Sequence, residues 1–174
     1  MTLINVSLPD GTVNEYAVGV TCAEVITDAL GRKHGCLAAR IDGVECDLSR
    51  VIDNDCSIEG ILSESENGIH ILRHSAAHLL AQAVTALYPD AKPTIGPAVD
   101  RGFYYDFAME QIVESDLKAI QKKMQELARK NFTVERIELT DKELQDHFAD
   151  NPYKLEIIND KIEDGSGSTI YKQD

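Results

Sequence analysis

The sequence lacks any hydrophobic run that approaches the roughly 18 residues needed to cross a bilayer. Its first six residues also lack a basic segment followed by an apolar one, so we expect no signal peptide. These absences exclude a membrane-spanning protein and a membrane partner, and they predict a cytoplasmic chain.

Cysteine pairs with the spacing of a metal or redox site are missing as well. The chain has four cysteines, and none forms a C-x-x-C pair: Cys22, Cys36, Cys46 and Cys56. Because the cytosol is reducing, we expect no disulfides. We therefore interpret the cysteines as small core or surface residues without a function of their own.

Basic residues are scarce, with 17 Lys and Arg against 30 Asp and Glu and a net charge of −13. Proteins that bind nucleic-acid phosphates normally carry a basic surface. A nucleic-acid role must therefore depend on a local basic patch or on other parts of a larger protein. The remaining composition, with 43% hydrophobic and 27% charged residues over 174 positions, is that of an ordinary globular chain of one domain or two small ones.

Residues 1–62 have the pattern of a small α+β domain. Thr21 and Glu24 form a capping box that starts a helix, and Gly31 ends it. The expected strands are residues 3–8, 12–18, 37–41, 43–46 and 56–62. The order of hairpin, helix and further strands is that of a ubiquitin-like β-grasp.

Residues 63–174 form a second expected domain, which begins with a polar stretch at residues 63–68, where we place the domain junction. The expected helices are residues 69–88, residues 116–130 after a cap at Ser115, and a helix from a capping box at Thr140 to about residue 149. The expected strands are a β-rich piece at residues 95–107, then residues 132–139, 153–158 and 170–174.

Two histidines, His74 and His78, stand four residues apart in the long expected helix. Side chains at this spacing are neighbours, about 5–6 Å apart at Cβ, and His70 extends the row within an arc of about 80°. Such a pair can bind a metal or position a water, although an isolated H-x-x-x-H is more often a solvated helix face. Ser75 stands where the H-E-x-x-H of zinc proteases has its general base, so that motif is absent.

Aromatic residues follow in Gly102 to Phe107. Alternation along a strand would send Phe103 and Tyr105 to one face and Tyr104 to the other. Core packing is the ordinary explanation of such a strand, and a phenol that orients a ribose or an amino group at a pocket wall is the functional one.

The third expected helix is locally basic, with five bases against three acids over residues 114–130. Lys118, Lys122 and Arg129 share one face, and Lys123 and Lys130 lie beside it. A solvated helix face is the ordinary explanation, and contact with RNA phosphates is the functional alternative.

Taken together, these motifs resemble the threonyl-tRNA synthetase family. Residues 71–80 look like the H-x-x-x-H helix that opens its editing domain, which alanyl-tRNA editing proteins share more distantly. The segments at residues 95–97 and 102–106 follow at the family's distance, and residues 8–11 begin a stretch similar to its TGS domain. The resemblance covers nearly the whole chain. It implies an α+β chain with a β-grasp TGS domain, followed by an α/β sandwich editing domain that is incomplete at its C-terminus.

In this family the synthesis site distinguishes threonine from serine by one methyl group, which is worth only roughly 1–3 kcal/mol. Mischarged seryl-tRNA(Thr) is therefore hydrolysed at a second site. Matching motifs imply that His74, His78 and Lys154 are catalytic there and that Tyr104 and Tyr105 bind substrate. Lys154, by itself an ordinary surface lysine, matches the editing lysine through its Pro-Tyr-Lys context.

The resemblance also implies partners and absences. The acceptor end of tRNA(Thr) and the rest of the synthetase are the expected partners, with a homodimer only in the full enzyme. No cofactor or metal is expected in this part, whereas ATP, magnesium and zinc belong to the ligase core, whose motifs are absent here. An Asp-x-Cys-x-x-x-His-like segment of the editing pocket is also absent, so we expect a truncated editing domain with weak activity or none.

Two other hypotheses stay open. A non-catalytic tRNA-binding or regulatory module of the same fold would bind tRNA through the basic helix and hydrolyse nothing. A small metallohydrolase would hold zinc on His74 and His78, but two ligands fall short of a typical zinc site and no cysteine follows Cys56.

Overall fold

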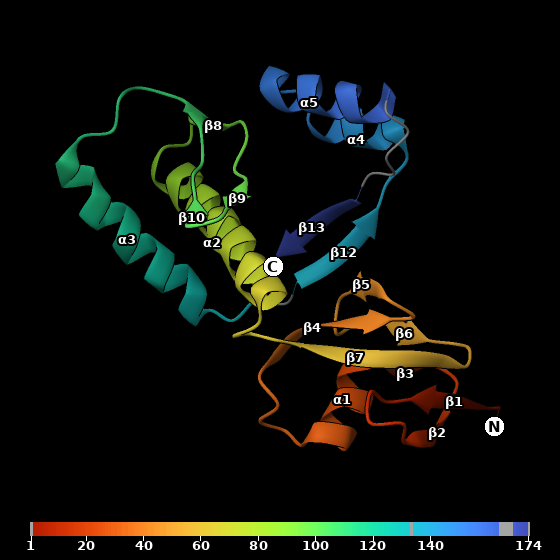
Figure 1. Cartoon of the computed structure of the whole chain (residues 1–174). Coiled ribbons are helices and arrows are strands. Elements are labelled where there is room, and N and C mark those ends of the chain that lie inside the picture. The colour runs from red at the N-terminus through yellow and green to blue at the C-terminus, as the bar shows by residue number, and fades with distance from the viewer. Residues whose placement is uncertain (1, 133, 164–168, 174) are drawn as a thin grey trace. The chain divides into compact units, whose positions relative to one another are not determined.

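A computed structural model describes residues 2–132, 134–163 and 169–173. The chain is a mixed α+β protein and divides into two units, Met1–Leu72 and Arg73–Asp174. The boundary falls inside the long helix α2 (Glu66–Leu87), shown in Figure 1. Within the described residues, no helix combines the length and the apolar character that crossing a membrane requires.

The first unit is built on a five-stranded sheet of order β2-β1-β7-β4-β5. Its strands are β1 (Leu3–Ser7), β2 (Val13–Ala17), β4 (Cys36–Ile41), β5 (Val44–Cys46) and β7 (Cys56–Leu62). β1 pairs antiparallel with β2 and parallel with β7, and β4 is antiparallel to both of its neighbours. Two short strands, β3 (Val20–Thr21) and β6 (Val51–Ile52), pair beside helix α1 (Cys22–Leu30).

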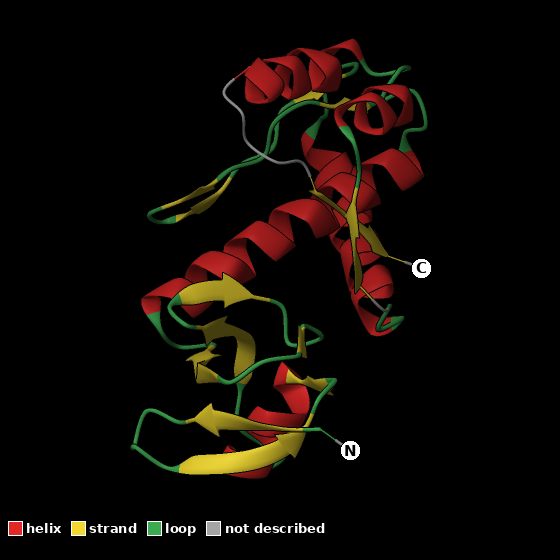
Figure 2. Cartoon of the chain, turned by 90° about the vertical axis from the view of Figure 1, so that its right-hand side faces the viewer, coloured by secondary structure: helices red, strands yellow, loops and turns green. Residues whose placement is uncertain are grey.

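The core of this unit lies between α1 and one face of the sheet (Figures 1 and 2). Ile4 and Val6 of β1 are buried in it, whereas Leu3 and Asn5 are exposed, so the alternation of the sequence is kept. Val25 and Ile26 of α1 complete the contact. Burying each such apolar side chain contributes roughly 1.5–3 kcal/mol, which holds the helix on the sheet.

Local signals determine where α1 and the β4–β5 turn begin. The Thr21 hydroxyl accepts a hydrogen bond from the Glu24 N–H at 3.3 Å, and the Glu24 carboxylate accepts one from the Thr21 N–H at 2.8 Å, which confirms the capping box. Asp42 and Gly43 both have positive φ, 48° and 83°. Two consecutive residues of this kind make the tight turn whose twist suits a β-hairpin.

The second unit contains the C-terminal part of α2 and three further helices: α3 (Glu114–Arg129), α4 (Asp141–His147) and α5 (Pro152–Glu163). Its core joins α2 to α3 through Ala83, Val84 and Ile120. Between α2 and α3 the chain forms two-residue strands: β8 (Lys92–Pro93), β9 (Ala98–Val99), β10 (Gly102–Phe103) and β11 (Phe107–Ala108). β12 (Val134–Glu138) pairs antiparallel with β13 (Thr169–Gln173).

The strand predicted over residues 153–158 is wrong, because this segment is the first half of helix α5. The sequence carries the signals of a helix start: Asn151 is followed by Pro152, a pair suited to the N-cap and first helical positions. Leu155 and Ile158 then recur at helical spacing, and Ile158 is buried.

Two further details differ from the prediction. Residues 102–107 are not one strand, because β10 ends before residues 104–106 and β11 begins after them. The two strands also pair with different partners, β9 and β8. Ser115 is not the cap of α3, which begins at Glu114. The Asp116 carboxylate instead accepts a hydrogen bond from the Val113 N–H at 3.0 Å.

Candidate functional site

The two histidines of α2 face each other. The Nε2 atoms of His74 and His78 lie 3.0 Å apart, and their rings meet edge to face with centroids 4.6 Å apart. At this distance one imidazole donates a proton and the other accepts it. The predicted side-by-side placement is therefore present, and His70 of the same row is exposed.

A lysine and a tyrosine that are distant in sequence meet in the same unit. The Nζ of Lys154, in the first turn of α5, donates a long hydrogen bond of 3.4 Å to the Tyr105 hydroxyl. The same Nζ lies 6.0 Å from the centroid of the Tyr105 ring, at the outer limit of a cation–π contact. Of the two predicted tyrosines, Tyr105 is thus the one that contacts Lys154, while Tyr104 is 50% exposed.

The Tyr105 ring is held by its surroundings. It stacks on Phe107 with centroids 4.9 Å apart. Gly96 also leaves room for the ring, because a Cβ at Gly96 would overlap the ring carbons. The backbone around the ring is paired as well: Thr94 N–H donates to the Asp106 carbonyl and Asp106 N–H donates to the Ile95 carbonyl, both at 2.9 Å.

The pKa values of His78, Lys154 and Tyr105 are all shifted in the direction that favours the neutral side chain. Burial lowers the pKa of His78, and the positive charges of His74 and Lys154 lower it further. Burial also lowers the pKa of Lys154, with a smaller contribution from Lys161, and it raises the pKa of Tyr105. His78 nevertheless keeps an exposed residue surface. The group therefore combines a desolvated interior with an edge that water or a substrate can reach.

The basic row of α3 points away from the core of the second unit. At 100° per residue, Lys118, Lys122 and Arg129 lie about 160–200° around the helix from the buried Ile120. All three are exposed. The two flanking residues are engaged locally: Lys123 pairs with Glu126 at 3.2 Å, and the Lys130 Nζ lies 5.5 Å from the Phe132 ring centroid.

The described part of the chain offers no clear metal site and no activated cysteine. No group of three or more His, Cys, Asp or Glu suited to a metal ion occurs there. The Sγ atoms of Cys22 and Cys46 lie 3.9 Å apart in the first unit. Burial raises the pKa of Cys22 to about 12, which makes this thiol a poor nucleophile.

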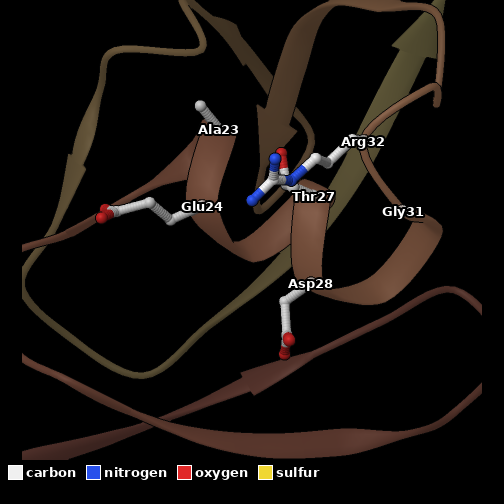
Figure 3. A pocket seen from close by; sticks show the side chains of 6 residues that line it. All are labelled: Ala23, Glu24, Thr27, Asp28, Gly31 and Arg32. Carbon is white, nitrogen blue, oxygen red and sulfur yellow. The ribbon is translucent and has the colours of Figure 1, made fainter.

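A shallow depression lies on α1 and is shown in Figure 3. Its lining residues are Ala23, Glu24, Thr27, Asp28, Gly31 and Arg32. It belongs to the first unit, and the Asp28 carboxylate already accepts a hydrogen bond from the Tyr16 hydroxyl at 2.9 Å. The depression holds none of the residues that carry the chemistry described above.

Both units are similar in sequence to known proteins. Residues 4–61 match the TGS domain. The chain is 43% identical over 176 aligned residues to the threonine--tRNA ligase of Streptococcus suis (strain 05ZYH33), covering 98% of this chain and 27% of that protein. The threonine--tRNA ligases of Streptococcus thermophilus (strain ATCC BAA-491 / LMD-9) and Streptococcus pneumoniae (strain Hungary19A-6) match with the same identity and coverage, 43%, 98% and 27%.

The chain thus spans about a quarter of the length of the curated relatives that it matches. The similarity covers both units, and the TGS match lies within the first. The chain therefore contains a TGS domain and is homologous, over nearly its whole length, to the N-terminal region of threonine--tRNA ligases.

Proposed function

We propose that the second unit belongs to the editing domain of a threonine--tRNA ligase, which hydrolyses the ester of mischarged seryl-tRNA(Thr). The observation that carries the proposal is the geometry within this unit: the Nε2 atoms of His74 and His78 lie 3.0 Å apart, and the Lys154 amine is held on Tyr105. The charge of Lys154 also contributes to the lowered pKa of His78. Titratable groups that alter one another's pKa beside an accessible edge are typical of a catalytic site. The similarity to threonine--tRNA ligases supplies the substrate class.

The chemistry is an ester hydrolysis. A water attacks the seryl carbonyl carbon and loses a proton, the tetrahedral oxyanion collapses, and the bond to the ribose oxygen breaks. The products are serine and the free ribose hydroxyl of the tRNA. His78 is the group proposed to take the proton from water and to return it to the departing ribose oxygen. Its lowered pKa leaves a neutral imidazole near neutral pH, which can accept that proton.

His74 and Lys154 are given supporting roles in the same step. His74, 3.0 Å from His78, is proposed to orient the ribose hydroxyl or the water through its shared hydrogen bond. The Lys154 ammonium is proposed to stabilise the oxyanion, since a fixed charge in a poorly solvated site stabilises developing charge strongly. Tyr105 holds that ammonium, and Tyr104 is a second, more exposed candidate for substrate contact.

Binding of the tRNA is assigned to the exposed row of α3. Lys118, Lys122 and Arg129 would contact phosphates near the acceptor end of tRNA(Thr), with Lys123 and Lys130 at the margin. We interpret the first unit as a ubiquitin-like β-grasp and the second as an editing fold. The other proposed partner is the remainder of a cytoplasmic, homodimeric synthetase, whose ligase core would use ATP, magnesium and zinc.

A chimera tests the proposal. This chain replaces the matching region of the Streptococcus suis ligase, and release of serine from seryl-tRNA(Thr) is measured beside charging of tRNA with threonine. The chimera is expected to do both, while His78→Ala and Lys154→Ala lose serine release by about 100-fold or more and keep charging.

Charging is the control for folding and tRNA binding. A chimera that charges threonine but leaves seryl-tRNA(Thr) intact contradicts the editing proposal. If the chain then binds this tRNA through α3, the non-catalytic tRNA-binding module takes its place.

A further inference from the structure

The side chain of Asn151 is bonded at both of its polar atoms. Its Oδ1 accepts a hydrogen bond from the Lys154 N–H at 3.2 Å, and its Nδ2 donates one to the Pro93 carbonyl at 2.9 Å. The Asn151 carbonyl accepts the first helical bond of α5, from the Leu155 N–H at 3.1 Å. Only one orientation of the amide satisfies both side-chain partners, so its oxygen and nitrogen are fixed by the network.

The first of these bonds is a helix cap, which many residues could supply. An N-cap needs an acceptor for the N–H at the third helical position, and Ser, Thr or Asp provides one as well as Asn. The capped position here is Lys154 itself. The second bond, from Nδ2 to Pro93, contributes nothing to capping and requires a donor that Asp lacks.

The second bond leads to the segment that holds Tyr105. Pro93 of β8 pairs with Phe107 of β11, and the Phe107 ring stacks on Tyr105. A further contact holds the same junction, because the Lys92 Nζ donates to the Asp150 carbonyl at 3.0 Å. Asn151 thus connects the backbone of Lys154 directly to the strand pair next to Tyr105.

We propose that Asn151 is a positioning residue, whose amide fixes the start of α5 on β8 and thereby holds the Lys154 amine beside Tyr105. The placement of Lys154 follows from the geometry alone, whereas its consequence for hydrolysis rests on the function proposed above. Capping and fixing are separable, since Asn151→Ser and Asn151→Thr keep an acceptor for the Lys154 N–H and remove the amide donor to Pro93.

The test uses the whole chain, labelled with 13C at His Cε1 and Lys Cε. NMR titrations of His78 and Lys154 are compared in wild type, Asn151→Ser, Asn151→Thr and Asn151→Ala, with His78→Gln and Lys154→Gln for assignment. Asn159→Ser is the matched control. It removes the side-chain amide of the same helix that accepts a hydrogen bond from Gln145 at 2.8 Å, outside the site.

In Asn151→Ser and Asn151→Thr we expect the pKa of Lys154 to rise toward its ordinary value, since the amine becomes more solvated. The pKa of His78 should rise with it, because a positive neighbour has moved away. Asn159→Ser should leave both unchanged, and thermal unfolding should show Asn151→Ser closer to wild type than Asn151→Ala. Two results together overturn the proposal. The pKa values of His78 and Lys154 in Asn151→Ser and Asn151→Thr equal those of wild type, while Lys154→Gln raises the pKa of His78.

The chimera adds a kinetic measurement. Asn151→Ser should lower kcat for serine release by about 10- to 100-fold with little change in KM, as expected for a displaced catalytic group. An unchanged kcat in an active chimera counts against the positioning role. A chimera without any serine release concerns the proposed function instead, and the NMR titrations still decide the role of Asn151.

Discussion

Replacing Gly96 by alanine tests how the Tyr105 ring is placed. A Cβ at this position would overlap the ring, so either the ring or the backbone must move. Overpacking of this kind costs about 1–3 kcal/mol. Because Gly96 is not among the described glycines with positive φ, alanine is compatible with its backbone, and the loss of chain entropy in the unfolded state offsets about 0.4–1 kcal/mol of that cost. We therefore expect a net loss of about 1–2 kcal/mol in the free energy of unfolding.

A double-mutant cycle separates the ring from the other effects of the substitution. In a Tyr105→Ala background the overlapping atoms are gone, so Gly96→Ala should be neutral or slightly stabilising. Urea unfolding of the four proteins, followed by far-UV circular dichroism, gives the coupling free energy, expected at about 1–3 kcal/mol. Effects that add within about 0.5 kcal/mol would show that Tyr105 does not occupy the space beside Gly96.

Two other predictions concern charge. The pKa of His78 is lowered in the folded chain, so the unfolded chain binds this proton more readily. The free energy of unfolding should therefore fall as the pH drops through the ordinary histidine value near about 6.5 toward the folded pKa. His78→Gln should remove this part of the pH dependence in urea unfolding, and an unchanged profile would assign it to another group. Replacing Lys118, Lys122 and Arg129 together by glutamine should reduce the slope of log affinity for tRNA(Thr) against log salt by about 0.7–0.9 for each phosphate that these side chains no longer neutralise, whereas Lys33→Gln in the first unit should not change it.

Signals that act over a few residues were readable in the sequence. The capping boxes at Thr21 and Thr140 involve partners three residues away, and both are present. The last strand of the first unit, Cys56–Leu62, matches its predicted bounds. The error at α5 is of the same local kind, because Asn151 and Pro152, directly before the predicted strand at residues 153–158, are the start signal of a helix.

The candidate site was predictable only in part for a physical reason. The contact between His74 and His78 follows from helical spacing, so the sequence is enough to predict it. The contact between Lys154 and Tyr105 joins residues 49 positions apart. This contact depends on the absent Cβ of Gly96 and on the amide of Asn151. No periodic pattern in the sequence predicts the role of either residue. Both residues act only where the two segments meet, and that meeting is a feature of the folded chain.

The location of Lys154 indicates that its position serves more than packing. The first turn of α5 contains this lysine and no acidic residue, although the positive end of a helix dipole favours negative side chains there. Burial adds a second cost to the ammonium, as its lowered pKa shows. A long, flexible lysine could avoid both costs by extending into water. Here the side chain is instead held on Tyr105, while its backbone N–H is capped by Asn151. Local rules of stability that are broken together at one residue are typical of functional sites, which agrees with the oxyanion-stabilising role proposed for Lys154.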